Sequence, residues 1–286
     1  DKMSQPQIEI MLIAAVVAAS CALVGTFLVL RRMSLMSDAI SHAILLGIVL
    51  MFFLVESTAS LPMIVAATAT GVLTVTLVEA LYRTRLVKAD AAIGLVFPAM
   101  FALGVILISR YAANVHLDTD AVLLGEIAFA PFDRLVVAGR DLGPRALWLA
   151  GAVGAVNLSF IVLFFKELKL ATFDAGLAAA LGFSPAIANY ALMTLVSVTA
   201  VGSFEAVGSV LVVALMIAPP ATAYLLTDRL PVMLGLAVLA GVVAAIAGYL
   251  VARWLDASIA GSMATMTGLL FVLALLLAPG RVLVAQ

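Results

Sequence analysis

The chain has 286 residues, of which 65% are apolar and only 11% are charged, and its formal net charge is −1. A soluble domain is about 25% charged and needs a polar surface, so this composition excludes a soluble enzyme and a disordered scaffold. It also offers no basic face for nucleic acid. The single cysteine, Cys21, excludes an internal disulfide and a cysteine metal cage. The sequence therefore predicts an all-α polytopic membrane protein.

Nine continuous apolar runs approach the length of about 20 residues that a helix needs to cross hydrocarbon. They lie at 8–30, 35–55, 61–81, 91–109, 146–165, 188–203, 206–226, 232–252 and 260–279. Continuous runs are typical of helices, because membrane strands alternate in hydrophobicity. The sixth and seventh runs are short and meet at 202–205, so they form either two crossings or a crossing and a re-entrant segment. We expect eight or nine spans in one bundle over residues 8–280.

The start of the chain and its basic residues bear on topology. We interpret Asp1 and Lys2 as additions before a native Met3, and 8–30 as a span rather than a cleaved signal peptide. If the spans alternate, nine basic residues fall on one side and five on the other: Arg31, Arg32, Arg83, Arg85, Lys88, Lys166, Lys169, Arg229 and Arg281 against Arg110, Arg134, Arg140, Arg145 and Arg253. The positive-inside rule then places the first set in the cytoplasm and the N-terminus outside.

Two connections between the runs are long enough to carry function. The outer one, 111–145, contains His116, Asp118, Asp120 and Glu126; we favour a solvated acidic face there over a metal site. The inner one, 166–187, contains Asp174 as an N-cap, Gly182 as a residue just past a helix end and Pro185 as a stop. These signals predict a short cytoplasmic helix over 175–181, which is either an ordinary connector or, as we favour, a docking element.

Three ionisable residues, Asp38, His42 and Glu205, are the main candidates for a functional role within the membrane. Because such groups cost several kcal/mol in the bilayer core, they suggest function. Asp38 and His42 are four residues apart, so they share a helix face and can ligate one divalent cation, although a structural ion pair remains open. Glu205 lies at the break between the sixth and seventh runs, either in an ion path or at a membrane face. The chain has no phosphate-binding loop and no hydrolase motif, so we expect no enzyme.

Four segments resemble, in order, the membrane permease subunits of ABC-type manganese, zinc and iron importers of bacteria. They are 23–47, which holds the Asp-x-x-x-His pair, 90–97, 173–182 and 205–223. The outer segment 114–133 is similar to the same branch. The resemblance implies a type II ABC importer-like bundle in the bacterial cytoplasmic (inner) membrane that moves its cargo by alternating access. One departure is Ser37, where many relatives have glycine.

The resemblance also implies partners. They are a cytoplasmic ATP-binding cassette ATPase, an extracytoplasmic metal-binding protein, and a second permease, either a copy or a relative. It implies that the coupling segment on the ATPase consists of Phe173, Asp174, Ala175, Gly176, Leu177, Leu181 and Gly182. Asp118, Asp120 and Glu126 are the expected docking residues for the binding protein.

The expected cargo is a divalent metal ion, with no permanently bound cofactor. The resemblance points to Asp38 and His42 as ion-path residues and, more weakly, to Glu205. We favour Mn²⁺ because no cysteine lies in the path, with Zn²⁺ or Fe²⁺ as alternatives. Other hypotheses are a siderophore or cobalamin-type organic cargo, ATP-independent secondary transport, and an intramembrane enzyme using Asp38 or Glu205 as acid or base.

Overall fold

The computed structural model describes residues 4–55, 60–111, 127–137 and 140–278. Within these ranges, nine helices are long and apolar enough to cross a membrane. They are α1 (Gln5–Leu30), α2 (Leu35–Val55), α3 (Ser60–Arg83), α4 (Ala89–Tyr111), α6 (Arg145–Leu163), α9 (Pro185–Val207), α10 (Ser209–Leu226), α11 (Leu230–Leu255) and α12 (Ile259–Leu277). The prediction of an all-α membrane bundle is confirmed. The sequence predicted eight or nine spans, and the described residues contain nine candidates.

The break between the sixth and seventh spans is not where the sequence placed it. Helix α9 continues through 202–205 and ends at Gly208, whose φ of 80° lies in the region that favours glycine. Ser203 is buried and forms a hydrogen bond with Cys21, so a polar residue there does not end the helix. Helices α9 and α10 are therefore two separate helices, each long and apolar enough to cross a membrane, which agrees with two crossings.

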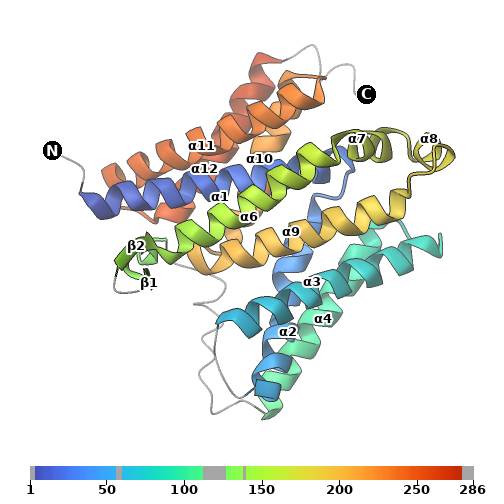
Figure 1. Ribbon diagram of the computed structural model, residues 1–286, viewed down its shortest axis with the longest axis horizontal. Helices are drawn as coiled ribbons and strands as arrows, with labels where there is room; N and C mark the ends of the chain where they lie inside the picture. Colours follow the sequence, from blue (N-terminus) through green and yellow to red (C-terminus); the bar gives the residue numbers. More distant parts are fainter. Residues whose placement is uncertain (1–3, 56–59, 112–126, 138–139, 279–286) are drawn as a thin grey trace.

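Helix α1 is the central element of the larger of two helix groups (Figure 1). It packs against α6, α9, α10 and α11, and half of its residues are buried. The second group consists of α2, α3 and α4, which pack on one another. Helix α9 contacts α1 and α6 on one side and α2 and α3 on the other, so it joins the two groups.

The two long connections lie at opposite ends of the helices (Figure 1). The described part of the outer connection forms η1 (Ala130–Phe132) and an antiparallel hairpin of β1 (Arg134–Val137) and β2 (Arg140–Pro144), near the start of α1. The inner connection forms α7 (Phe165–Phe173) and α8 (Ala175–Ala180) at the other end. The sequence did not predict the hairpin or α7.

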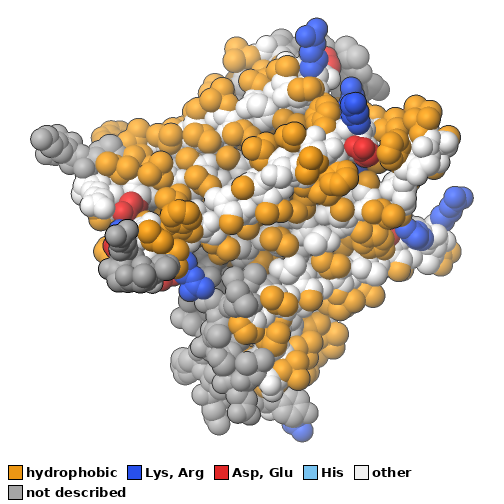
Figure 2. Space-filling model, in the orientation of Figure 1, with side chains coloured by type: hydrophobic (Ala, Val, Ile, Leu, Met, Phe, Trp, Pro, Cys, Tyr) orange, Lys and Arg blue, Asp and Glu red, His pale blue; other side chains and the backbone are white. Residues whose placement is uncertain are grey.

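The surface agrees with a molecule embedded in hydrocarbon. Figure 2 shows apolar side chains over the lengths of the helices, while acidic and basic side chains gather toward their ends. Large apolar side chains are exposed on most of the spanning helices, for example Leu103, Leu239 and Leu273. In water such a surface would be unfavourable, whereas lipid tails solvate it.

Close helix packing depends on glycine at particular crossings. A Cβ added to Gly25 of α1 would clash with the backbone carbonyl of Met216 in α10. One added to Gly248 of α11 would clash with the backbone of Met263 in α12. Small residues allow helix backbones to approach in membranes, where packing replaces the hydrophobic effect as the driving force.

The first prediction concerns the crossing of α1 and α10. Gly25→Ala forces the two backbones apart, so we expect a loss of about 1–3 kcal/mol of stability, typical of overpacking. Thermal unfolding of the detergent-purified protein measures this as a lowered Tm. Gly151→Ala in α6 is the matched control, because a Cβ there meets no atom within 4 Å. Equal Tm values for the two variants would contradict the packing argument.

Candidate functional site

Asp38 and His42 lie on one face of α2, as their spacing predicted. Asp38 is in the first turn, and its Oδ1 lies 3.6 Å from Nε2 of His42. The side chains are 45% and 40% exposed in the single chain, so neither is sealed within the bundle. The pair is too far apart for a normal hydrogen bond, and each group keeps the ability to bind something else.

Two aromatic rings from α4 contact His42. Phe97 stacks on the imidazole with centroids 5.8 Å apart, and Phe101 meets it edge-on at the same distance. The two phenylalanines are four residues apart, so they project from one face of α4. They restrict the orientation of the His42 ring. Sequence analysis missed both roles, although the i, i+4 aromatic spacing was visible.

The geometry suits a shared cation. An N···O separation of 3.6 Å is spanned by two metal–ligand bonds of about 2.1 Å that meet at about 120°. Among the residues that the structure describes, no group of three or more His, Cys, Asp or Glu side chains could hold a metal. The described part of the chain therefore brings together two possible ligands, Asp38 and His42.

The neighbouring serines are not additional ligands in this arrangement. Ser37 donates its hydroxyl proton to the carbonyl of Ser34, and Ser41 donates to the carbonyl of Ser37. Both side chains are buried. Ser37 thus fits within the helix packing, and it leaves the Asp38–His42 geometry undisturbed.

Several predicted site residues cannot be placed. The backbone of Glu205 lies in α9, three residues before Gly208, but its side chain is outside the described residues. Asp118, Asp120 and Glu126, together with His116, fall in 112–126, which also lies outside them. The structure therefore tests neither the third metal ligand nor the docking residues.

The inner connection contains the predicted short helix, one residue shorter than expected. The carboxylate of Asp174 accepts a hydrogen bond from the Leu177 N–H at 2.8 Å, which confirms it as the N-cap of α8. Gly182 has a φ of 86°, and the N–H groups of Gly182 and Phe183 donate to the carbonyls of Ala179 and Ala178. These two bonds form the Schellman motif that ends the helix.

Two parts of the inner connection differ from the prediction. Residues 166–173 belong to α7, a helix with one buried apolar residue, Leu168, that the sequence treated as connector. Pro185 does not stop a helix but begins α9, with Ser184 as its N-cap. Proline fits the first turn of a helix because its missing N–H would have no partner there.

Helix α8 projects from the end of the bundle (Figure 1), and apolar side chains in and beside it are exposed. Phe173, Leu177 and Leu181 are 61%, 47% and 61% exposed. Ala175, Gly176 and Gly182 are exposed as well. An apolar patch at a polar end of a membrane protein is typical of a docking surface for a soluble partner.

With this geometry established, the chain can be compared with known proteins. Residues 5–278 match the ABC 3 transport family. The chain belongs to this family. It is therefore the membrane subunit of an ABC transporter and a multi-pass bacterial membrane protein, and ATP is hydrolysed by a separate subunit. Membership implies an ATPase and a substrate-binding protein as partners.

Curated relatives extend over most of the chain. The zinc transport system membrane protein TroD of Treponema pallidum is 57% identical over 95% of this chain and 74% of that protein. The manganese transport system membrane protein MntD of Bacillus subtilis is 49% identical over 93% of this chain and 90% of that protein. The resemblance found in the sequence is thereby confirmed.

Solved structures agree with the fold. PsaBC from Streptococcus pneumoniae in complex with Fab matches with a TM-score of 0.78 and 31% identity, covering 96% of this chain and 93% of that chain. An inward-facing ABC transporter described as metal-chelate type matches with a TM-score of 0.67, covering 94% of this chain and 85% of that chain. At 20% identity, the second likeness shows the fold alone.

The second prediction concerns the cap of α8. Asp174→Ala removes the acceptor for the Leu177 N–H, so we expect the local stability of α8 to fall by about 1 kcal/mol. Hydrogen exchange measured by mass spectrometry should then be about fivefold faster in α8, while exchange in α9 is unchanged. Asp174→Asn keeps a capping oxygen and is the control. Unchanged exchange in the alanine variant would contradict the role of the cap.

Proposed function

We propose that the chain is the permease of an ATP-driven importer for a divalent metal ion, and that Asp38 and His42 line the ion path. The observation that carries the proposal is the half-exposed carboxylate–imidazole pair within a spanning helix, at a separation that suits two bonds to one cation. Relatives named for zinc and manganese transport support the choice of cargo.

A second permease completes the path in this proposal. A carboxylate and an imidazole left facing lipid would be costly, so the face of α2 that bears them needs a cover or a water-filled path. A second copy, or a related permease, would bring its own Asp-x-x-x-His pair to the same axis. Two pairs offer four ligands, enough to replace several waters of an entering ion, yet each chain holds the ion only weakly.

The metal we favour is Mn²⁺, with Zn²⁺ or Fe²⁺ as alternatives. Carboxylate and imidazole bind all three ions, whereas a thiolate would favour zinc. The single thiol, Cys21, is fully buried in α1 and offers no ligand to a path. Glu205 is proposed as a further, weaker participant, and its backbone lies in the last turn of α9.

Transport in this proposal couples two ends of the molecule. The binding protein docks on the outer connection through Asp118, Asp120 and Glu126 and releases the ion toward the path. The ATPase seats against α8, and ATP binding and hydrolysis move that helix with α7 and α9, which flank it in the chain. The exposed apolar side chains of α8 support this role.

An organic cargo is less favoured. A siderophore or cobalamin-type molecule needs a wide cavity, and Asp38 and His42 would then act in gating or packing. The relatives reported above are named for the transport of zinc and manganese, not of an organic molecule.

The third prediction tests the ion path. The permease is reconstituted with its ATPase and binding protein in proteoliposomes, and uptake of radioactive Mn²⁺ and Zn²⁺ is measured. Asp38→Asn and His42→Gln each remove one metal-binding atom. Changing a residue that only supports a metal ligand already costs about 10–100-fold, so we expect uptake to fall by at least that factor. Asp90→Asn, at the exposed start of α4, is the matched control.

Assembly and ATP hydrolysis are checked for every variant, so that a lost complex is not mistaken for a lost ligand. If both path variants transport like the wild type, the pair is structural and the proposal fails. Competition between the two ions identifies the cargo: the ion whose uptake persists in an excess of the other is the substrate.

A further inference from the structure

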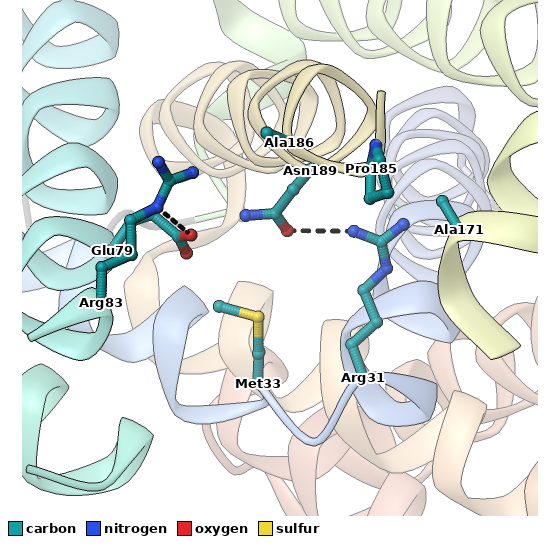
Figure 3. A pocket seen from close by; sticks show the side chains of 8 residues that line it. All are labelled: Arg31, Met33, Glu79, Arg83, Ala171, Pro185, Ala186 and Asn189. Atoms are coloured by element: carbon teal, nitrogen blue, oxygen red, sulfur yellow. Dashed lines mark hydrogen bonds and ion pairs between the residues drawn. The ribbon is translucent and has the colours of Figure 1, made fainter. Parts of the chain in front are cut away.

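A pocket lies at the end of the bundle that carries α7 and α8 (Figure 3). Its volume is about 350 Å³, and it is bounded by the end of α1, the end of α3, the α7 segment and the start of α9. Its polar lining consists of Arg31, Arg83, Glu79 and Asn189. It is separate from the Asp38–His42 pair, whose residues do not line it.

Arg31 forms hydrogen bonds with its neighbours, but those neighbours leave its charge uncompensated. Its Nε donates to the hydroxyl of Thr172 at 3.1 Å, and its Nη1 donates to the amide oxygen of Asn189 at 2.9 Å. Both acceptors are uncharged, and the buried Nη2 has no hydrogen-bond partner within the described ranges. Burial lowers the pKa of Arg31, because desolvation disfavours its charge. Arginine nonetheless stays charged, so an anion beside it would be stabilising.

Asn189 adds a donor to the pocket. Since its amide oxygen accepts from Arg31, its amide nitrogen points away, toward the side that holds Glu79 and Arg83 (Figure 3). On that side Arg83 donates through Nε to Glu79 at 3.0 Å. The lining thus carries two positive charges and one negative charge, a net charge of +1, with donors arriving from three helices or their ends.

We propose that this pocket binds a phosphate group. A planar guanidinium group can hold two oxygens of a tetrahedral phosphate through parallel, charge-assisted hydrogen bonds. The volume admits a phosphate with room for a substituent. The pocket is at the end of the spanning helices, where acidic lipid headgroups gather, so the phosphate comes either from such a lipid or from free phosphate.

Occupancy would affect the segment that contacts the ATPase. Arg31 already joins the end of α1 to α7 and α9, the two helices on either side of α8. A bound phosphate would add Arg83 and α3 to the same junction. Because a ligand stabilises the state that binds it, the phosphate favours the arrangement of α7, α8 and α9 seen here.

The fourth prediction uses two variants that should change phosphate affinity in opposite directions. Arg31→Gln removes the charge and should weaken phosphate binding about tenfold or more, the value of a charged hydrogen bond. Glu79→Gln removes the only negative charge in the lining and should strengthen binding. Arg32→Gln removes an equal charge one residue away, where the side chain is exposed and does not line the pocket, so it is the matched control.

Binding is measured on the purified permease–ATPase complex in detergent. Native mass spectrometry compares the retention of phosphatidylglycerol with that of phosphatidylcholine, and calorimetry titrates inorganic phosphate. Retention of phosphatidylglycerol that depends on Arg31 identifies a lipid headgroup; an Arg31-dependent heat with inorganic phosphate, without lipid retention, identifies free phosphate. Phosphate bound at the ATPase is unaffected by these variants and cancels in the comparison.

The proposal is overturned if neither probe distinguishes Arg31→Gln from Arg32→Gln. Should Arg31→Gln fail to assemble, Arg83→Gln and Glu79→Gln decide the question, since Arg83 is largely exposed and neither side chain is needed to seal the core. Weaker binding in the first with stronger binding in the second supports the proposal, and any other pair of results refutes it.

Discussion

The cost of placing charge in hydrocarbon is the constraint on which this structure depends. It forces the backbone into helices that satisfy their own hydrogen bonds, and it leaves most charged side chains near the helix ends. Against that background, Asp38 and His42 stand out because they lie on a spanning helix and remain half exposed. The same constraint applies at the bundle end, where Arg31 is surrounded by neutral acceptors. At both places, the Asp38–His42 pair and Arg31, a further group of suitable charge would be stabilising.

Sequence predicted the parts of the fold that follow from local chemistry. Continuous apolar runs located the nine spanning helices of the described residues, and the Asp174 and Gly182 caps located α8 to within one residue. The i, i+4 spacing placed Asp38 and His42 on one face of a helix. In each case the signal extends over one or two helical turns, a distance at which sequence spacing determines geometry.

Predictions failed where the same local sequence pattern is compatible with two different structures. Polar residues at 202–205 suggested a break, but a buried serine with a partner is tolerated within a membrane helix, and the actual break needed the positive φ of Gly208. The charged stretch of α7 looked like a connector because its apolar face is narrow. Contacts between helices could not be predicted from sequence spacing. Phe97 contacts His42, and Arg31 forms a hydrogen bond with Asn189, although the partners are far apart along the chain.

The placement of these features suggests how motion at α8 reaches the ion pair. Helix α2 begins four residues after Arg31, which is itself tied to α7 and α9. From the start of α2, Asp38 is about 5 Å along the axis and His42 about 10 Å, at a rise of about 1.5 Å per residue. A shift of α7 and α9 would therefore act on α2 through Arg31 and a three-residue turn. His42 is held against α4 by Phe97 and Phe101, so moving α2 relative to α4 would change the ring's orientation. If the pair binds an ion as proposed, a changed ring orientation would weaken one of its two ligands and favour release, so the short turn between Arg31 and α2 would couple the proposed docking segment to the proposed path.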